Sequence, residues 1–469
     1  MTRRRFLALG AAAVAVGAGV AVLEAEHPWQ TNHRANASKA PAGAIVPDVV
    51  ADGRTDDRAA IQKALDSAPG DRPCTIWLPG LCAVKQAGVS GGAPFGLVVR
   101  KNGVTLTGAA GAGLVSTVPG IRLLLVDGAQ APADDPLNPD HWITSAPVLP
   151  FGGNVAQGQT QISLASASDA AKLAPGDVVF LRTGQLINSK LPREPDAELN
   201  EVAGVSGTTV TLRYPTAKPY APERHIQGRS GPTAPDGAGA PAPWGVVRAT
   251  DIVVRDFAVR GLRLLAESDQ STTAGVQMFQ VWGAVVDNCS IDFGKYGVAA
   301  RYARQVTISG TTLNTVGPMG PRDPAWVAPS TGCTDWLVEH CRGGGTVPAK
   351  LHGHEGIADL RYVDWQSKTP DGPGQAGASN ISVRARAYNH SYDVVMSGAY
   401  TDRNCAMVEV TAAVTGPPKQ VQFERLRLSG SPGLAFLFIQ STAVTIYRDG
   451  LALPHGAGVR LEDGARPFV

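Results

Sequence analysis

A strong net charge is missing from this chain of 469 residues, which carries 42 Lys and Arg against 40 Asp and Glu. The formal charge of +2 leaves no field strong enough to hold nucleic acid or an acidic membrane surface, so neither is expected as a partner. Charged residues make up only 17% of the chain, and long heptad-patterned helices are absent. These absences argue against a helical protein.

Cysteine is also scarce, with six residues in the whole chain, too few to build a disulfide scaffold. Cys74 and Cys82 flank a predicted strand and turn and could pair, whereas Cys289 and Cys341 occupy similar repeat contexts. We interpret these cysteines as small buried side chains. No Cys-x-x-Cys pair and no Cys/His zinc spacing occurs, so a structural zinc site is not expected.

Turn-forming residues are plentiful instead, with 54 glycines and 35 prolines. This composition is typical of a turn-rich β protein. Length alone would suggest two or three domains, but a repetitive β architecture can extend this far as one body.

Residues 1–37 are interpreted as a signal peptide with its cleavage region. Thr2-Arg3-Arg4-Arg5-Phe6-Leu7 precedes an apolar stretch from Ala8 to Leu23, a pattern that resembles a twin-arginine export signal. The stretch is short and rich in Ala and Gly, which argues against a stable membrane anchor. With a cleavage point at Ala35-Asn36-Ala37, we expect the twin-arginine export machinery as a partner and a periplasmic or secreted location.

The segment 48–68 carries the most information about the fold. A short β run at Val49-Val50 meets a polar turn at 52–57, whose Thr55, Asp56 and Asp57 are expected to cap the helix that follows. One face of that helix is apolar, through Ala60, Ile61, Ala64, Leu65 and Ala68. Then comes Thr75-Ile76-Trp77-Leu78-Pro79-Gly80, a predicted strand closed by a turn.

This segment resembles the N-terminal segment of the pectate-lyase-like superfamily, in which a short helix plugs the open end of a right-handed parallel β-helix. The resemblance implies an all-β fold with an N-terminal capping helix. It concerns the fold first, because no catalytic signature of the related polygalacturonases is present; His352-Gly353-His354 only approaches one.

The predicted organisation has five parts. A linker at 38–46 precedes the N-terminal cap and first coils at 47–126, which include strands at 95–99 and 104–108. The part 127–245 reads as a small antiparallel β insert, because short alternating strands are separated by Gly/Asp turns. These strands are predicted at 161–164, 173–181, 201–205 and 208–212. The main coils and the C-terminal end occupy 246–469.

From residue 251 onward a loose internal repeat recurs every 20–35 residues. Each copy alternates β-branched and polar residues, and Gly or Asn punctuates the turns. The copies are at 251–257, 284–291, 305–309, 336–341, 380–384, 421–425 and 444–447. One coil cannot bury its inner face alone, so this pattern predicts coils stacked on one another.

Aligning the strands after each turn suggests a substrate groove. Val276-Gln277-Met278-Phe279 is matched with Val298-Ala299-Ala300-Arg301 and with Ala349-Lys350-Leu351-His352. Further copies are placed at 392–397 and 434–438. Strand alternation then puts Gln277, Phe279, Arg301, Lys350 and His352 on the outer surface.

Two polar clusters could carry chemistry on this surface. In the first, Lys350, His352 or His354 would act as the base and Glu355 as an acid or positioning group. The second would bind a carboxylated sugar. Its candidate substrate-binding residues, together with others expected in the groove, are Arg301, Arg384, Arg386, Tyr388, His390, Asp393 and Trp365. The alternative for both clusters is a solvated turn or strand face.

Three functions remain open. A polysaccharide lyase needs a base and positive charge beside a uronate, which the Arg, Lys and His residues favour. A glycoside hydrolase needs two facing carboxylates. A glycan-binding surface protein would cut nothing. No cofactor is expected; calcium is conceivable but lacks support, because no clustered Asp run lies on a predicted groove strand. The partner would be a polysaccharide, and the chain a monomer or a homotrimer.

Overall fold

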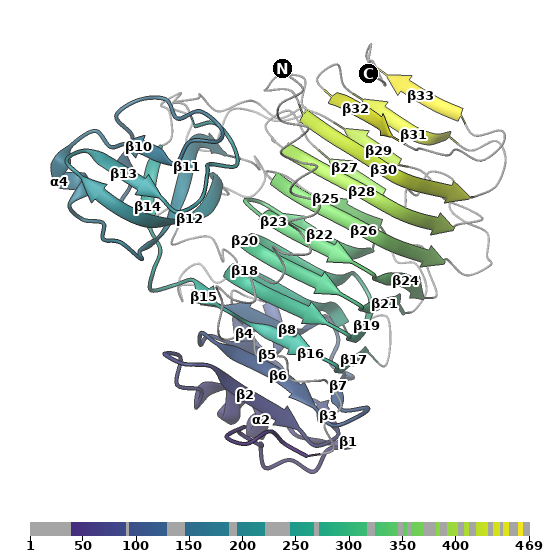
Figure 1. The fold of residues 1–469 in the computed structure, drawn as a ribbon. Coiled ribbons are helices and arrows are strands. Elements are labelled where there is room, and N and C mark those ends of the chain that lie inside the picture. Colours follow the sequence, from purple (N-terminus) through teal and green to yellow (C-terminus); the bar gives the residue numbers. More distant parts are fainter. Residues whose placement is uncertain are drawn as a thin grey trace.

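The structure is a computed structural model of the chain. Its described residues are 39–90, 93–128, 146–186, 195–220, 244–266, 272–316, 324–345, 350–353, 358–368, 381–384, 392–401, 408–411, 419–429, 435–440, 444–449 and 458–462. The expected signal peptide therefore lies outside the described residues. Figure 1 shows two parts, an elongated stack of strands and a smaller lobe beside it. None of the described helices is long and apolar enough to cross a membrane.

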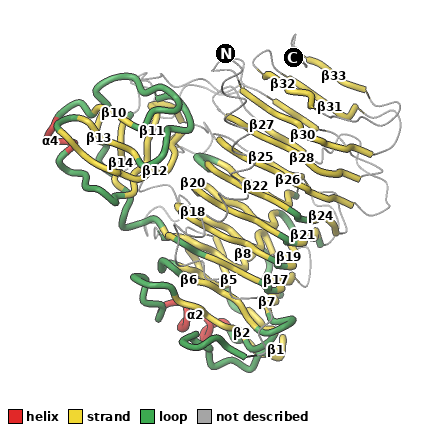
Figure 2. Tube along the Cα trace, viewed as in Figure 1, coloured by secondary structure: helices red, strands yellow, loops and turns green. Residues whose placement is uncertain are grey.

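The stack is built from three ladders of parallel strands, and each coil of the chain adds a strand to each ladder (Figures 1 and 2). What we call the first sheet contains β2 (Cys74–Leu78), β6 (Val104–Gly108), β16 (Ala258–Arg260), the second half of β18 (Thr272–Asp287), the second half of β20 (Tyr296–Ser309), β23 (Thr334–Glu339), β26 (Ala358–Lys368), β28 (Tyr392–Thr401), β30 (Lys419–Ser429) and β32 (Val444–Asp449).

The second sheet contains β1 (Asp52–Asp56), β3 (Leu81–Val84), β7 (Gly113–Ser116), β17 (Arg263–Ala266), β19 (Ser290–Phe293), β21 (Thr312–Thr315), β24 (Arg342–Gly345) and the C-terminal ends of β26, β28 and β30, whose first parts belong to the first sheet. The third sheet contains β5 (Ala93–Val99), β8 (Ile121–Asp127), the first halves of β18 and β20, β22 (Ala325–Ser330), β25 (Lys350–Gly353), β27 (Ile381–Arg384), β29 (Val408–Thr411), β31 (Ala435–Gln440) and β33 (Gly458–Glu462). Two short strands flank these sheets, β4 (Gly88–Ser90) and β15 (Val254–Arg255).

Aliphatic side chains fill the interior of the stack in columns. Along the third sheet the paired residues Leu97, Leu124, Val276, Val298 and Val327 are each fully buried. Along the first sheet the corresponding column is Ile76, Leu106, Val259, Val286, Ile308 and Val338. Each coil covers the inner face of its neighbour, so the apolar surface is removed from water only when coils stack.

The coils turn at corners where the backbone repeatedly takes positive φ angles. One corner places Gly261, Asn288, Gly310 and His340 at φ values of 63°, 51°, 55° and 52°. A second corner does the same with Asp256, Gly283, Gln305 and Asp335. Left-handed backbone is costly for residues other than Gly, Asn and Asp. Its recurrence coil after coil shows that each corner is fixed by the stack.

The N-terminal segment folds largely as its sequence predicts, but its acidic residues act differently. The helix α2 spans Arg58–Asp66 and buries Ile61, Ala64 and Leu65. The expected strand at Val49-Val50 does not form, and the predicted turn contains β1 instead. Of the residues expected to cap the helix, Asp57 does not, because its carboxylate accepts the backbone N–H groups of Val50 and Ala51 instead, whereas Asp56 accepts the N–H of Arg58 at 3.3 Å.

Helix α2 lies against the outermost strand of the third sheet. The side-chain amide of Gln62 donates to the carbonyl oxygen of Val98, and its oxygen accepts the N–H of the same residue, both at 2.9 Å. Arg58 Nε donates to the carbonyl oxygen of Gly96 at 2.7 Å. These side chains satisfy the free edge of β5, which would otherwise expose unpaired backbone groups.

The smaller lobe is a six-stranded antiparallel sheet inserted between β8 and β15. Its strands are β9 (Leu149–Pro150), β10 (Gln161–Ser163), β11 (Val178–Leu186), β12 (Pro195–Ser206), β13 (Thr209–Leu212) and β14 (Gly245–Arg248), and α4 (Ala167–Ala170) is its helix. We call this lobe the insert. One face of its sheet packs on its own core, which includes Val179, Leu181 and Val246, and the other packs on the stack through Val178, Phe180 and Val247.

The cysteines that the structure describes are all buried and free. Cys289, Cys333 and Cys341 are stacked in the interior, as their repeat contexts predict for the first and third of them. Cys74 and Cys82 are also free thiols in the core, so the suggested bond between them is not formed.

Candidate functional site

Arg301 is the one predicted site residue whose side chain the structure describes. It lies on β20, is half-buried, and pairs with Phe279 on one side and Ser330 on the other. The alignment of Val276–Phe279 with Val298–Arg301 is therefore correct residue for residue.

Three further candidates fall on the third sheet. Lys350 and His352 lie on β25, and Arg384 lies on β27, the next strand of the ladder. His352 pairs with Ser382, and Leu351 pairs with Val327. Because Val327 pairs with Val298, Leu351 belongs to the Val276 column rather than to the Met278 column. The predicted register of β25 was thus wrong by two residues, which keeps the inward and outward faces unchanged.

Two candidates lie elsewhere. Asp393 is the second residue of β28, which pairs with β26 and β30 in the first sheet. Trp365 lies on β26 and pairs with Gly398, where the chain passes from the first sheet to the second. Neither residue lies on the strand ladder that carries Lys350 and His352, so the alignment that placed residues 392–397 in that ladder is wrong. The remaining candidates, His354, Glu355, Arg386, Tyr388 and His390, lie outside the described residues.

The outer surface of the third sheet places Arg122, a residue that the sequence analysis missed, beside Arg301. The guanidinium of Arg122 lies 5.5 Å from the ring centroid of Phe279, a cation–π distance. Burial lowers the pKa of Arg122, and the Arg301 charge lowers this pKa further, while Asp127 and Tyr296 oppose the shift. The charge of Arg301 therefore acts on Arg122 across a partly buried surface, and guanidinium groups are donors suited to anionic ligands.

Aromatic rings border these arginines. Lys295 Nζ lies 4.6 Å from the ring centroid of Tyr296, and Tyr296 pairs with Ala274, which in turn pairs with Arg122. Phe279 packs with the outward side chains of Phe95, Val98 and Leu125. We call the set Arg122, Asp127, Phe279, Tyr296 and Arg301 the basic surface. A lone Arg within the apolar run Ile121–Val126 was the sequence signal for it, because an Arg in such a strand must point outward or be paired.

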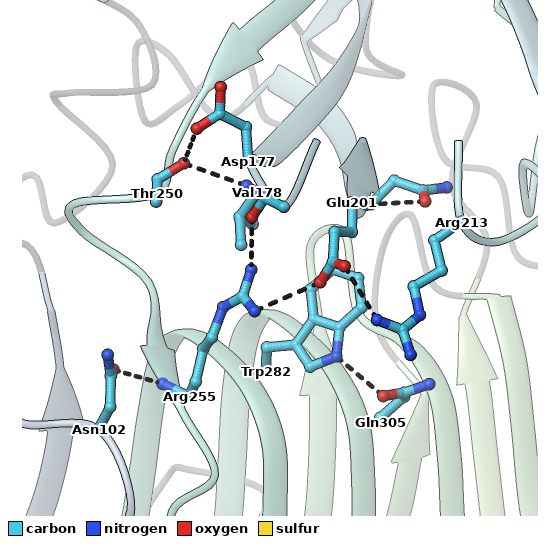
Figure 3. Close-up of polar contacts among 11 residues, drawn as sticks. Asn102, Asp177, Val178, Glu201, Arg213, Thr250, Arg255, Trp282 and Gln305 are labelled. Carbon is cyan, nitrogen blue, oxygen red and sulfur yellow. Dashed lines mark hydrogen bonds and ion pairs between the residues drawn. The ribbon is translucent and has the colours of Figure 1, made fainter. Parts of the chain in front are cut away.

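A second polar arrangement lies where the insert meets the stack (Figure 3). Arg255 of β15 lies 3.3 Å from the Glu201 carboxylate of the insert and donates to the carbonyl oxygen of Gly176 at 3.2 Å. Glu201 also binds Arg213 at 3.0 Å. Nearby, the indole N–H of Trp282 donates to Gln305 at 2.8 Å, which orients the ring against the insert.

Glu198 is the most deeply buried carboxyl in the described part of this interface. Both of its oxygens accept the backbone N–H of Ala217 at 3.0 Å, and its side chain has no exposed surface. Burial raises the pKa of Glu198 to about 7, against the opposing effects of the Arg304 and Lys218 charges. A sugar chain could not reach this carboxyl without undocking the insert, so we assign it to the interface rather than to catalysis.

Metal-binding clusters are not seen in the described ranges: no three His, Cys, Asp or Glu residues there come together to hold an ion. A hydrolase would need two facing carboxylates. On the basic surface the described carboxyl is Asp127, which is buried beside Arg122.

Comparison with known proteins gives only distant likenesses. No protein-family model and no curated protein matches the chain. Among solved structures, the tailspike protein gp49 of Pseudomonas phage LKA1 is 15% identical, with a TM-score of 0.40 over 87% of this chain and 76% of that one. A tailspike mutant of E. coli bacteriophage HK620 in complex with pentasaccharide is 10% identical, with a TM-score of 0.36 over 92% and 63%. The A-module of the mannuronan C-5 epimerase AlgE4 from Azotobacter vinelandii is 13% identical, with a TM-score of 0.23 over 90% and 97%.

Proposed function

We propose that the chain is an exported, carbohydrate-active member of the pectate-lyase-like superfamily that acts on an extracellular, uronate-bearing polysaccharide. In this proposal the stack is a right-handed parallel β-helix, α2 is its N-terminal cap, and the third sheet holds the sugar chain. The observation that carries the proposal is that the guanidinium groups of Arg122 and Arg301 share one outward surface with Phe279 and Tyr296.

The geometry suits an extended polyanion. Strands in a ladder are spaced about 4.8 Å apart, so outward residues in successive rungs form a regular row along the stack. Guanidinium groups bind carboxylates with paired hydrogen bonds, and aromatic faces pack against sugar rings. The row of outward positions runs on from Arg301 towards β25 and β27, which carry Lys350, His352 and Arg384.

The favoured reaction is β-elimination. It requires a base that removes the proton next to the uronate carboxylate, and positive charge that stabilises the developing enolate. Arg122 and Arg301 would supply the charge. Lys350 or His352 remains the proposed base, with His354 and Glu355 as the neighbouring candidates from the sequence. No cofactor is part of the proposed mechanism.

Two alternatives to the lyase are kept. One is glycoside hydrolysis, which paired carboxylates would favour. The other is a glycan-binding protein without catalytic activity. Digestion of acidic polysaccharides by the purified protein separates the three. A lyase produces absorbance in the unsaturated-uronate band, which His352→Ala or Lys350→Ala should abolish without unfolding the protein. New reducing ends without that absorbance would establish hydrolysis, and binding without either product would establish a binding protein.

Export is proposed from the N-terminal pattern alone. Replacing Arg3 and Arg4 by Lys should trap the precursor in the cytoplasm if the twin-arginine machinery carries it. Undiminished secretion of that variant would reject this route. We further propose that the protein is a monomer or a homotrimer. Light scattering of the purified protein measures its mass and so distinguishes the two states.

A further inference from the structure

We propose that the insert is a fixed wall of the polysaccharide-binding surface, and that Arg304 and Gly332 of the stack are the positioning residues that set its orientation. The wall rests on the proposed function, whereas the positioning role rests on the contacts between the insert and the stack alone.

The insert presents the edge of one strand to the stack. Residues 197–201 of β12 pair with β11 along one edge, and two carbonyl groups on the other edge meet the stack. Arg304 Nη1 donates to the carbonyl oxygen of Leu199 at 2.6 Å in a buried position. Two residues earlier, the carbonyl oxygen of Ala197 lies so close to Gly332 that a Cβ there would stand 2.4 Å from it. Carbonyls two residues apart on a strand point the same way, so the two contacts together fix this edge.

Ring packing holds the insert at the same place. The rings of Phe180 and Tyr302 meet edge to face, with centroids 5.4 Å apart and planes at 85°. The Arg304 guanidinium lies 4.7 Å from the Tyr214 ring centroid of the insert and 5.4 Å from the Trp282 ring centroid of the stack. Contacts between domains that are both apolar and hydrogen-bonded restrict relative motion, so the insert is held rather than hinged.

The fixed edge stands at the border of the basic surface. Arg301 immediately precedes Tyr302, and Phe279 immediately precedes Gln280, the residues with positive φ that begin the corner. Ser330, the partner of Arg301, is likewise followed by the corner residues Thr331 and Gly332. The insert thus begins where the basic surface ends. A sugar chain bound across Arg122 and Arg301 would contact the insert at that border.

Gly332→Ala tests the positioning role, and Gly207→Ala is its matched control. Both glycines have left-handed φ angles, 71° and 60°, so both variants carry the same backbone strain. A Cβ at Gly332 would meet the Ala197 carbonyl and the Tyr302 ring, whereas nothing lies within 4 Å of a Cβ at Gly207. Arg304→Lys is the second variant, which keeps the charge and loses the planar contact with Tyr214 and Trp282.

Two measurements are made on each variant of the full chain. Pulsed electron paramagnetic resonance between nitroxide labels at Gln161→Cys and Lys63→Cys gives the distance from the insert to the stack. Equilibrium binding is measured with polygalacturonate, alginate and hyaluronan. We expect Gly332→Ala and Arg304→Lys to shift or broaden the distance distribution and to weaken binding at least tenfold, while Gly207→Ala changes neither.

Each result has a distinct meaning. Wild-type distances in both Gly332→Ala and Arg304→Lys would overturn the positioning role. A shifted distance with unchanged binding would overturn the wall and leave the polysaccharide-binding function standing. A wild-type protein that binds none of the three polysaccharides would reject the proposed function and the wall together, while a shifted distance would still support the positioning role.

Discussion

The carboxylate of Asp57 accepts the backbone N–H of Val50 at 2.8 Å. Asp57 occupies the N-cap position of α2, yet its side chain does not cap the helix. It ties down the chain segment that leads into the stack, and the same carboxylate accepts the N–H of Ala51. The acidic residue that the sequence assigns to helix capping therefore anchors the first coil.

Removing this anchor should destabilise the protein. Asp57 is buried, and Asp57→Ala leaves two backbone donors without their charged acceptor. Hydrogen bonds to charged groups are each worth roughly 1.5–3 kcal/mol, so losing two of them should lower the free energy of unfolding by about 3 kcal/mol or more in denaturant titrations. Asp71→Ala, at an exposed position, should change it by less than about 0.5 kcal/mol. Equal effects of the two substitutions would contradict the anchoring role.

Stability should depend on pH through Glu198. Its pKa is raised from 4.5 to about 7 by burial, so between these values the folded protein holds a proton that the unfolded chain releases. The resulting stabilisation is complete below about pH 4.5 and is lost as the pH rises through 7. In the wild type, the free energy of unfolding should fall by roughly 3 kcal/mol as the pH rises across this range, since one pKa unit corresponds to 1.36 kcal/mol. Glu198→Gln should remove this fall. Denaturant titrations at several pH values measure this dependence for the wild type and for Glu198→Gln. If the free energy of unfolding changes with pH equally in both proteins, Glu198 does not titrate in this range.

The interior thiols should resist alkylation. Cys289, Cys333 and Cys341 are buried, and burial raises the pKa of each thiol to about 12. The thiolate is the reactive form, so iodoacetamide at pH 8 should label these residues only after denaturation. Peptide mass spectrometry assigns the label to each cysteine. Labelling of the native protein as fast as that of the unfolded chain would mean that the coils open readily.

Loss of Arg122 should weaken the binding of acidic polysaccharides. Arg122→Met keeps the apolar contact with Phe279 and removes the charge beside Arg301, so affinity should fall about tenfold or more at low salt. The difference in affinity between the wild type and Arg122→Met should become smaller at higher salt, because salt screens the attraction between the arginine and the polysaccharide. Arg263→Met removes an exposed charge from the second sheet and should bind as the wild type does. Isothermal titration calorimetry with polygalacturonate measures the affinity of the wild type and of both variants.

The fold could be predicted in outline because its main signals are local. The apolar face of α2, the alternating strands of the insert and the Val/Ile runs at 284–286, 305–308 and 336–338 each follow from side-chain period. Those three runs do form one ladder, through Val285, Thr307 and Leu337.

The assignment of strands to sheets could not be predicted, because all three sheets share the same period of two. The residues at 392–397 and 381–384 look alike in sequence, but the first group lies in the first sheet and the second in the third. A groove drawn from such an alignment mixes residues of two surfaces, as Asp393 and Trp365 show. Arg122 was missed because its strand precedes the recognisable repeat.

The repeated corners also define the unit by which such a chain can change length. Asn288 and Gly310 occupy equivalent left-handed positions in consecutive coils, and the residues before them, Asp287 and Ser309, are paired. Excising residues 288–309 would join Asp287 to Gly310 with the corner geometry intact and every later strand still in register. Removal of a few residues would instead shift every following side chain around the coil. Viable insertions and deletions in the stack should therefore come as whole coils, or as excursions from a corner such as the insert itself.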